Sequence, residues 1–125
     1  MNRDLVNNIA ETQSVVVVAG TSGTGTYAGT AVDLQGYDSA EVVGLLGAAG
    51  AGTIKIQECA TSGGTYTDVA AAEVEGTQGT ALVQNGAVSL GYKGQLRYIK
   101  AHITVTTDGV IGGLVIKGNP FVAKA

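Results

Sequence analysis

Apolar residues in this chain occur in short runs, and clusters of glycine separate one run from the next. Residues 53–59 alternate, with Ile54 and Ile56 on one side and polar residues on the other, as in a half-buried strand. The run 40–46 is almost entirely apolar, which indicates a strand buried on both faces. The strands expected in the first half of the chain are 15–19, 27–34, 40–46 and 53–59.

Three short segments have the composition of hairpin turns, namely Ser62-Gly63-Gly64, Asn85-Gly86 and Asp108-Gly109. An Asn-Gly or Asp-Gly pair readily supplies the two positive φ angles of a type I′ turn. The first turn is expected to pair residues 54–60 with 65–69. The second is expected to pair 81–84 with 87–90, and the third 95–107 with 110–117.

The proposed hairpins also imply a register. In the third hairpin Ile103 faces Leu114 and Ala101 faces Ile116, while Lys100, His102 and Thr104 share the opposite face. In the second hairpin the residues expected on one face are Ala81, Val83, Val88 and Leu90. Because this register agrees with the apolar pattern, we expect both pairs of strands to be hairpins.

These elements predict an all-β fold: an antiparallel β-sandwich, jelly-roll-like, with eight or nine strands in two sheets. We expect a single sandwich domain over residues 14–125, preceded by an N-terminal arm over residues 1–13. In that arm Leu5, Val6, Ile9 and Ala10 have helical spacing, so a short helix and an extended arm are both open interpretations.

Length and charge exclude several classes of protein. The chain has 125 residues, enough for one domain with its own core, and 20 of them are glycine. The net charge of −3 and the scattered lysines and arginines argue against nucleic-acid binding. No apolar run approaches the roughly 20 residues of a membrane span, so no membrane partner is expected. A single cysteine excludes an internal disulfide and suits synthesis in a reducing compartment.

Sequence motifs for catalysis or metal binding are scarce. The Gly20–Gly25 loop lacks the lysine of a phosphate-binding loop and precedes a strand rather than a helix. His102 and Cys59 are single residues of their kinds, whereas a zinc site needs several such ligands. The carboxylates are spread along the chain and include no calcium-loop motif. We therefore expect no catalytic residue, no cofactor and no metal, and a protein that is not an enzyme.

Several segments together resemble a family of small virion structural proteins of tailed bacteriophages. The segments that carry the resemblance are Val32–Ala40, Lys55–Glu58, Tyr66–Val69, Gly91–Gly94, Arg97–Lys100, Lys117–Pro120 and the opening Met1–Leu5. The resemblance implies a β-sandwich that acts as a head decoration, or cement, protein, and it brings no catalytic residues with it. The long Gly-Ala loops and the single cysteine of this chain depart from the family pattern.

On this basis we expect a capsid decoration protein that binds the outer head surface and stabilises the shell by bridging capsid subunits. Its partners would be the major capsid protein and further copies of itself, as a dimer, a trimer or neighbouring copies on the capsid. It would be made in the host bacterial cytoplasm and would be located on the capsid surface of the virion. The expected contact residues are Asn2, Arg3, Leu5, Val6, Ile9, Pro120 and Phe121. One alternative is a tail, neck or head–tail connector protein. Another is a carbohydrate-binding β-sandwich module, for which the five tyrosines are the candidate residues.

Overall fold

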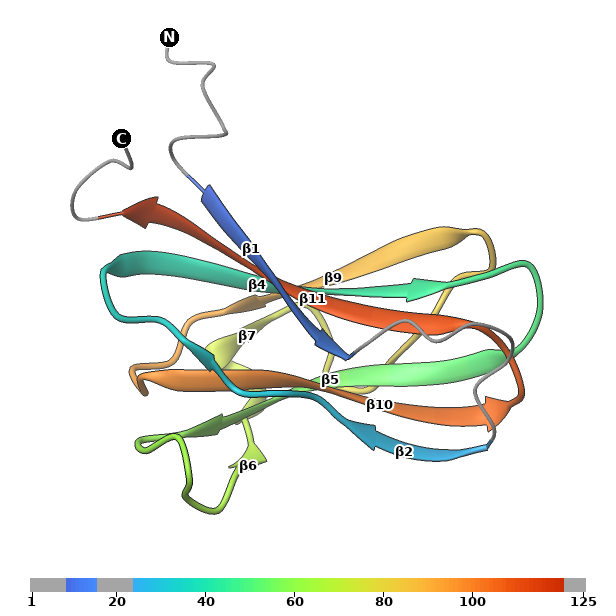
Figure 1. The fold of residues 1–125 in the computed structure, drawn as a ribbon, viewed down its shortest axis with the longest axis horizontal. Helices are drawn as coiled ribbons and strands as arrows, with labels where there is room; N and C mark the ends of the chain where they lie inside the picture. Colours follow the sequence, from blue (N-terminus) through green and yellow to red (C-terminus); the bar gives the residue numbers. More distant parts are fainter. Residues whose placement is uncertain (1–8, 16–23, 121–125) are drawn as a thin grey trace, which may run out of the picture.

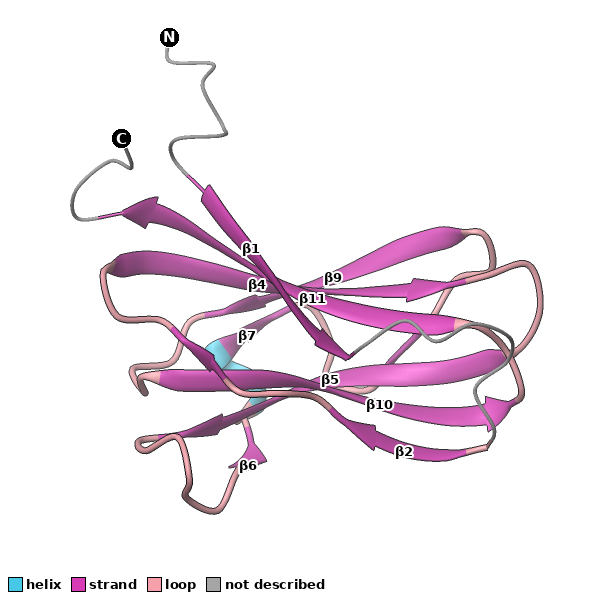
Figure 2. Cartoon of the chain, viewed as in Figure 1, coloured by secondary structure: helices cyan, strands magenta, loops and turns pink. Residues whose placement is uncertain are grey.

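Two antiparallel sheets packed face to face form the fold in the computed structural model, which describes residues 9–15 and 24–120 (Figure 1). Figure 2 shows strands throughout and one short helical segment, the 3-10 helix Ala71–Glu73. The strands are β1 Ile9–Val15, β2 Gly25–Ala28, β3 Val32–Asp33, β4 Tyr37–Leu46, β5 Ala51–Cys59, β6 Thr67–Asp68, β7 Val74–Glu75, β8 Thr80–Ala81, β9 Gly86–Tyr92, β10 Tyr98–Thr107 and β11 Ile111–Pro120. The predicted all-β sandwich is confirmed.

The order of the strands is that of a jelly roll. One sheet has the order β1-β11-β4-β9-β7, and we call it the first sheet. The second sheet has the order β2-β10-β5-β6, with β3 also paired to β10 and β8 also paired to β5. Strands β2 and β3 both pair with β10, and β6 and β8 both pair with β5, so each of these two pairs is counted here as one position. The eight positions, numbered in chain order, are then arranged 1-8-3-6 in the first sheet and 2-7-4-5 in the second, and β7 is added at the edge of the first sheet. Nearly every step along the chain therefore crosses between the sheets, as in a jelly roll.

The core lies between the sheets and follows the predicted alternation in the central strands. In β5, Ile54 and Ile56 are fully buried, and in β10 the same is true of Ile99, Ala101 and Ile103. These side chains meet Val42 and Val115, the inward residues of the first sheet. Lys100, His102 and Thr104 share the outer face of β10, as expected. The alternation expected for residues 53–59 is confirmed, and so is the pairing of β5 with β6 after the turn at 62–64.

Two of the three predicted hairpins are wrong. Strand β9 pairs with β4 and β7, whereas β8 pairs with β5, so the Asn85-Gly86 turn joins two different sheets. Likewise β10 belongs to the second sheet and β11 to the first, so Asp108-Gly109 also joins the two sheets. Asn85 has φ 54°, but neither Gly86 nor Gly109 has a positive φ. Val83, which was expected on a buried face, is 53% exposed, and Leu82 is buried instead.

The glycines at one end of the sandwich allow three of these connections to touch. Gly47 N donates to Val110 O (2.9 Å), and Asn85 N donates to Gly47 O (2.9 Å). A Cβ added to Gly109 would lie 2.3 Å from Ala49 O. Gly109 is therefore required by close backbone packing rather than by turn geometry.

The N-terminal boundary also differs from the expectation. Residues 9–13, assigned to an arm or helix, form most of β1 and pair with β11. Of the strand expected at 15–19 only Val15 is described, and it ends β1. The strand expected at 27–34 is divided into β2 and β3 because the chain leaves the sheet at Gly29–Ala31.

Two polar side chains complete the sheets where strands are interrupted. Ser14 Oγ accepts from Ala101 N (3.1 Å) and donates to Thr30 O (2.8 Å), so it joins β1 to β10 across the gap between β2 and β3. Gln78 performs a similar role between β6 and β8. Its Oε1 accepts from Ile56 N (2.8 Å), and its Nε2 donates to Ile56 O (2.9 Å) and Val69 O (3.0 Å).

Candidate interaction surfaces

The residues expected to contact a partner belong to the two ends of the chain. Of these, Ile9 begins β1 and Pro120 ends β11, whereas Asn2, Arg3, Leu5, Val6 and Phe121 lie outside the described residues. The pairing of β1 with β11 sets Ile9 opposite Gly118, and Pro120 lies opposite Tyr37 of β4. Both ends of the described chain therefore reach the same end of the sandwich (Figure 1).

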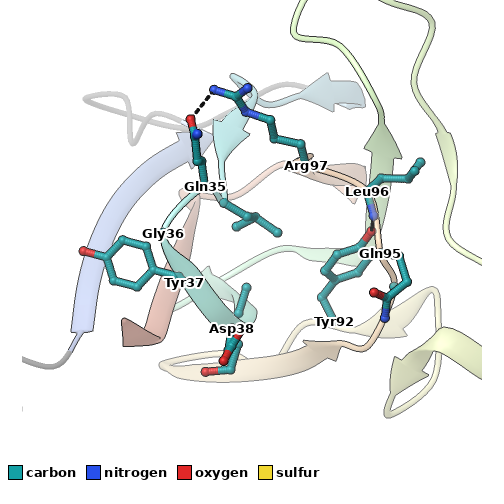
Figure 3. Close-up of a pocket in the computed structure, with 12 residues that line it drawn as sticks. Gln35, Gly36, Tyr37, Asp38, Tyr92, Gln95, Leu96 and Arg97 are labelled. Carbon is teal, nitrogen blue, oxygen red and sulfur yellow. Dashed lines mark hydrogen bonds between the residues drawn. The ribbon is translucent and has the colours of Figure 1, made fainter. Parts of the chain in front are cut away.

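A pocket of about 470 Å³ lies at this same end. Two chain segments enclose it, residues 34–40 around the start of β4 and residues 92–97 between β9 and β10 (Figure 3). Its lining mixes the rings of Tyr37 and Tyr92 with amide, carboxylate and hydroxyl groups. The pocket is open to solvent on one side, and we call this region the end pocket.

One wall of the end pocket is held by an ion-pair cluster around Arg97. The guanidinium makes two hydrogen bonds to the Asp33 carboxylate, both of 2.8 Å, and a third to Gln35 Oε1 of 2.6 Å. The hydrogen bonds from Arg97 lower the pKa of Asp33 to about 2. Lys117 Nζ donates to Asp33 O (3.1 Å) and lies 4.8 Å from the centre of the Tyr37 ring. The two hydrogen bonds to Asp33 fix the orientation of the Arg97 guanidinium and neutralise its charge, so Lys117 carries the remaining positive charge of this wall.

The inner side of the end pocket is formed by Tyr92, which is 9% exposed. Its hydroxyl donates to Glu58 Oε2 (2.6 Å) and accepts from Leu96 N (3.0 Å). Burial and the hydrogen bond to Glu58 raise the pKa of Tyr92, so this hydroxyl stays protonated. Tyr92 thereby fixes the loop that carries Gln95 and Leu96.

Other polar side chains on the rim of the end pocket have no hydrogen-bond partner among the described residues. Asp38, Ser39 and Gln95 make no side-chain hydrogen bond to the described part of the chain, and Asp38 and Gln95 are both exposed. These groups are free to bind a partner that enters the pocket.

The outer face of the second sheet carries a separate polar network. Asp68 accepts from Lys55 (2.9 Å) and Gln57 (3.0 Å), and these two hydrogen bonds lower its pKa. His102 lies beside Lys55 in the register, and its Nδ1 is buried with no partner among the described residues. Burial and the charge of Lys55 lower the pKa of His102. The groups of this face mainly satisfy one another.

Cys59 and the carboxylates do not form a metal-binding cluster in residues 9–15 and 24–120. Cys59 Sγ has a weak contact with Thr61 Oγ1 at 3.9 Å, and no group of three His, Cys, Asp or Glu gathers there in a way that could hold a metal ion. In the same residues no helix is long and apolar enough to cross a membrane.

The outer face of the first sheet is more apolar than that of the second. Val43 and Leu45 of β4 lie on this face beside Leu114 and Ile116 of β11. Val43 is only 9% exposed, although it lies outside the central core cluster, because it is on the opposite face of β4 from the core residue Val42. Beside these residues a smaller pocket of about 190 Å³ runs along residues 11–13 of β1.

Several residues of these surfaces could not be identified from the sequence. Asp33 and Arg97 are 64 positions apart, and no motif links them. Aspartate is common in turns, so the sequence predicted only a turn role for Asp38. The resemblance included residues 34–40 and, of the second segment of the end pocket, all but Gln95 and Leu96, but it assigned no role to them.

The comparisons with known proteins give no relative for this chain. No family model matches it, and neither a curated protein nor a solved structure matches it.

Proposed function

We propose that this protein is a capsid decoration protein of a tailed bacteriophage, which binds the outer head surface and stabilises the shell. One observation supports it most: the pairing of β1 with β11 brings the bases of both expected contact segments to the end of the sandwich that carries the end pocket. The resemblance to phage virion proteins, which the comparisons leave without independent support, supplies the class of partner. The major capsid protein is that partner, and the contact surface is this end of the molecule.

The mechanism is passive. Each copy bridges neighbouring capsid subunits, so rupture of the shell also requires the contacts of the decoration protein to break. Binding to the intact shell alone stabilises it by mass action, and many equivalent sites multiply a modest gain per copy. The Arg97–Asp33 wall and the side chains of Asp38, Ser39 and Gln95 provide the polar part of the contact.

The experiment uses particles of the phage that encodes this chain, produced without it, and purified protein added back. The full-length protein should bind these particles and raise their rupture temperature. A deletion of residues 1–8 should fold normally, since β1 begins at Ile9, and should bind more weakly. If the full-length protein neither binds nor protects the particles, the proposal is wrong.

A matched pair of charge reversals locates the contact surface. Asp38 and Asp108 are both exposed, but they lie at opposite ends of the sandwich. Asp38→Arg should weaken binding to the particles, whereas Asp108→Arg should bind as the unmodified protein does. Equal loss of binding in both variants would exclude the end pocket as the specific contact.

The copy number separates decoration from the tail, neck or connector alternative. A decoration protein occupies many equivalent sites on the head, whereas a neck ring closes with about a dozen copies. Quantitative mass spectrometry of purified virions measures this ratio.

The end pocket also favours one second candidate, a carbohydrate-binding module. The half-buried Tyr37 ring beside polar side chains suits a neutral sugar, because an aromatic face packs against its C–H groups. Binding to a glycan array that Tyr37→Ala abolishes, without any effect of the protein on particle stability, would support this candidate over decoration.

A further inference from the structure

The outer faces of the two sheets differ in their chemistry. In the central strands β5 and β10 of the second sheet the outward positions are mainly polar, namely Thr53, Lys55, Gln57, Lys100, His102 and Thr104. In the central strands β4 and β11 of the first sheet four large apolar side chains lie outward, namely Val43, Leu45, Leu114 and Ile116. An antiparallel sheet usually presents polar side chains on the face that is turned away from the core. The apolar outer face of the first sheet therefore indicates a surface that a partner covers.

Unpaired carboxylates flank this apolar face. Glu11 of β1 and Glu41 of β4 lie opposite Ile116 of β11, one on each side of it. Directly opposite residues share one face, so the two carboxylates flank Ile116, with their Cα atoms about 10 Å apart. Neither glutamate pairs with a cation in the described part of the chain, whereas Glu75, further along the same row, pairs with Lys93 (3.3 Å). The described residues thus give this face an apolar centre and a net negative charge.

The same face is hollowed beside Leu45 and Leu114. The pocket of about 190 Å³ lies there, and residues 11–13 of β1 form its other wall. Its size suits one large aliphatic side chain. A side chain that fills an apolar pocket, with polar contacts around it, is the usual anchor of a protein interface. Because Glu11 belongs to the wall of this pocket, a basic residue next to the anchor would meet an opposite charge.

We propose that the outer face of the first sheet binds a protein segment in which a large apolar side chain has a lysine or arginine on either side. The apolar side chain packs against Leu114 and Ile116 at the pocket, and the two cations pair with Glu11 and Glu41. The identity of the partner, a capsid subunit, rests on the proposed function. A protein that bridges two subunits needs two separate contact surfaces, and the end of the sandwich supplies one of them.

A short peptide tests this chemistry on the isolated full-length protein. In extended acetyl-Lys-Ser-Leu-Ser-Lys-amide the two lysines and the leucine share one side, because alternate residues of an extended chain do so. The peptide should shift the NMR amide signals of β4 and β11 of the isotope-labelled protein in a saturable way. A peptide with glutamate in place of both lysines, or with serine in place of leucine, should bind about fivefold more weakly or worse.

A matched pair of charge reversals locates the binding site of the peptide. Glu41→Lys should weaken binding of the basic peptide about fivefold or more. Asp108→Lys makes the same change of charge at an exposed position on the connection between β10 and β11, and it should leave the binding unchanged. Should Glu41→Lys fail to fold by circular dichroism, Glu11→Lys on the exposed edge strand makes the same test.

Four results would refute the proposal: no saturable binding at millimolar peptide, equal binding of the acidic peptide, signal shifts confined to β5 and β10, or equal loss of binding in both variants. Binding that appears only after deletion of residues 1–8 would also refute it, because the chain itself would then cover the face.

The particle assay separates this inference from the proposed function. If both hold, Glu41→Lys still attaches to particles through the end of the sandwich but raises their rupture temperature less than the unmodified protein does. If Glu41→Lys protects the particles fully, this inference is wrong and decoration stands. If the peptide binds as expected but the full-length protein does not bind particles, the decoration proposal alone fails.

Discussion

Ser14 is a small polar residue of β1 that joins the first sheet to β10 of the second. Its replacement tests whether the hydroxyl completes the edge of the second sheet between β2 and β3. The residue is 2% exposed. Its hydroxyl serves two backbone groups, the N–H of Ala101 and the carbonyl of Thr30. In Ser14→Ala both groups lose their partner. No other strand can replace the lost hydroxyl, because the neighbouring chain is already held at this point by the hydrogen bond from Gly29 N to Ala101 O (2.8 Å).

The expected cost follows from these two groups. A buried donor or acceptor left without a partner costs about 1 to 3 kcal/mol. The exposed position of Thr30 allows water to satisfy its carbonyl in part, so the larger share comes from the Ala101 N–H on a buried residue. We expect Ser14→Ala to lower the free energy of unfolding by about 2 to 4 kcal/mol.

Urea unfolding followed by circular dichroism measures this loss. The dependence of the free energy on urea should not change, because the surface exposed on unfolding is almost the same. Ser89→Ala is the matched control: Ser89 is an exposed serine on β9 without a side-chain partner in the described residues, and its loss should stay within about 0.5 kcal/mol. If Ser14→Ala is no more destabilising than Ser89→Ala, the hydroxyl does not complete the sheet as described.

Three further predictions use the same unfolding assay. Gln78→Leu should cost about 2 to 3 kcal/mol, because it leaves the buried Ile56 N–H without an acceptor, and a loss below about 1 kcal/mol would contradict that role. Gly109→Ala should destabilise more than Gly86→Ala, since the added Cβ meets backbone oxygen at 2.3 Å at Gly109 but a side-chain methyl at 3.2 Å at Gly86; the reverse order would be incompatible with the arrangement of the two connections. The pKa of Asp33 is lowered from 3.8 to about 2, so its stabilising ion pair is fully present above pH 3.8 and is lost as the pH falls toward 2. Asp33→Asn should flatten the stability profile in that interval, by a small amount because the pair is exposed, and an unchanged profile would show that the pair does not contribute.

The sequence was informative where a strand buries one face in the usual way. Ile54 and Ile56 alternate with polar residues, and only a strand with one inward face explains that spacing. The apolar run 40–46 marked β4, a central strand of the first sheet, with Val42 on the core side and Val43 covered on the outer side. The sandwich class follows from such local patterns, because they depend on the side-chain period of two residues.

The connections could not be deduced in the same way. A hairpin and a connection between two facing sheets both bring inward residues of consecutive strands together, so the alternation of β10 did not separate the two cases. The expected pairs of Ile103 with Leu114 and Ala101 with Ile116 are wrong, because Ile111 and Val115 are the residues of β11 that face the core. Turn composition did not separate the two cases either, since Gly109 is needed for backbone contact with Ala49 rather than for a positive φ.

The end pocket and the outer face of the first sheet depend on contacts between distant positions. Arg97 meets Asp33 only because β3 pairs with β10, and Ile9 lies near Pro120 only because β1 pairs with β11. The sequence by itself determined that the fold is a β-sandwich and which residues of the central strands β5 and β10 face inward, because burial of alternate residues is a local property. The tertiary structure alone decided which strands are neighbours and which residues share an outer face, because pairing between distant segments depends on how all the strands fit together around one core.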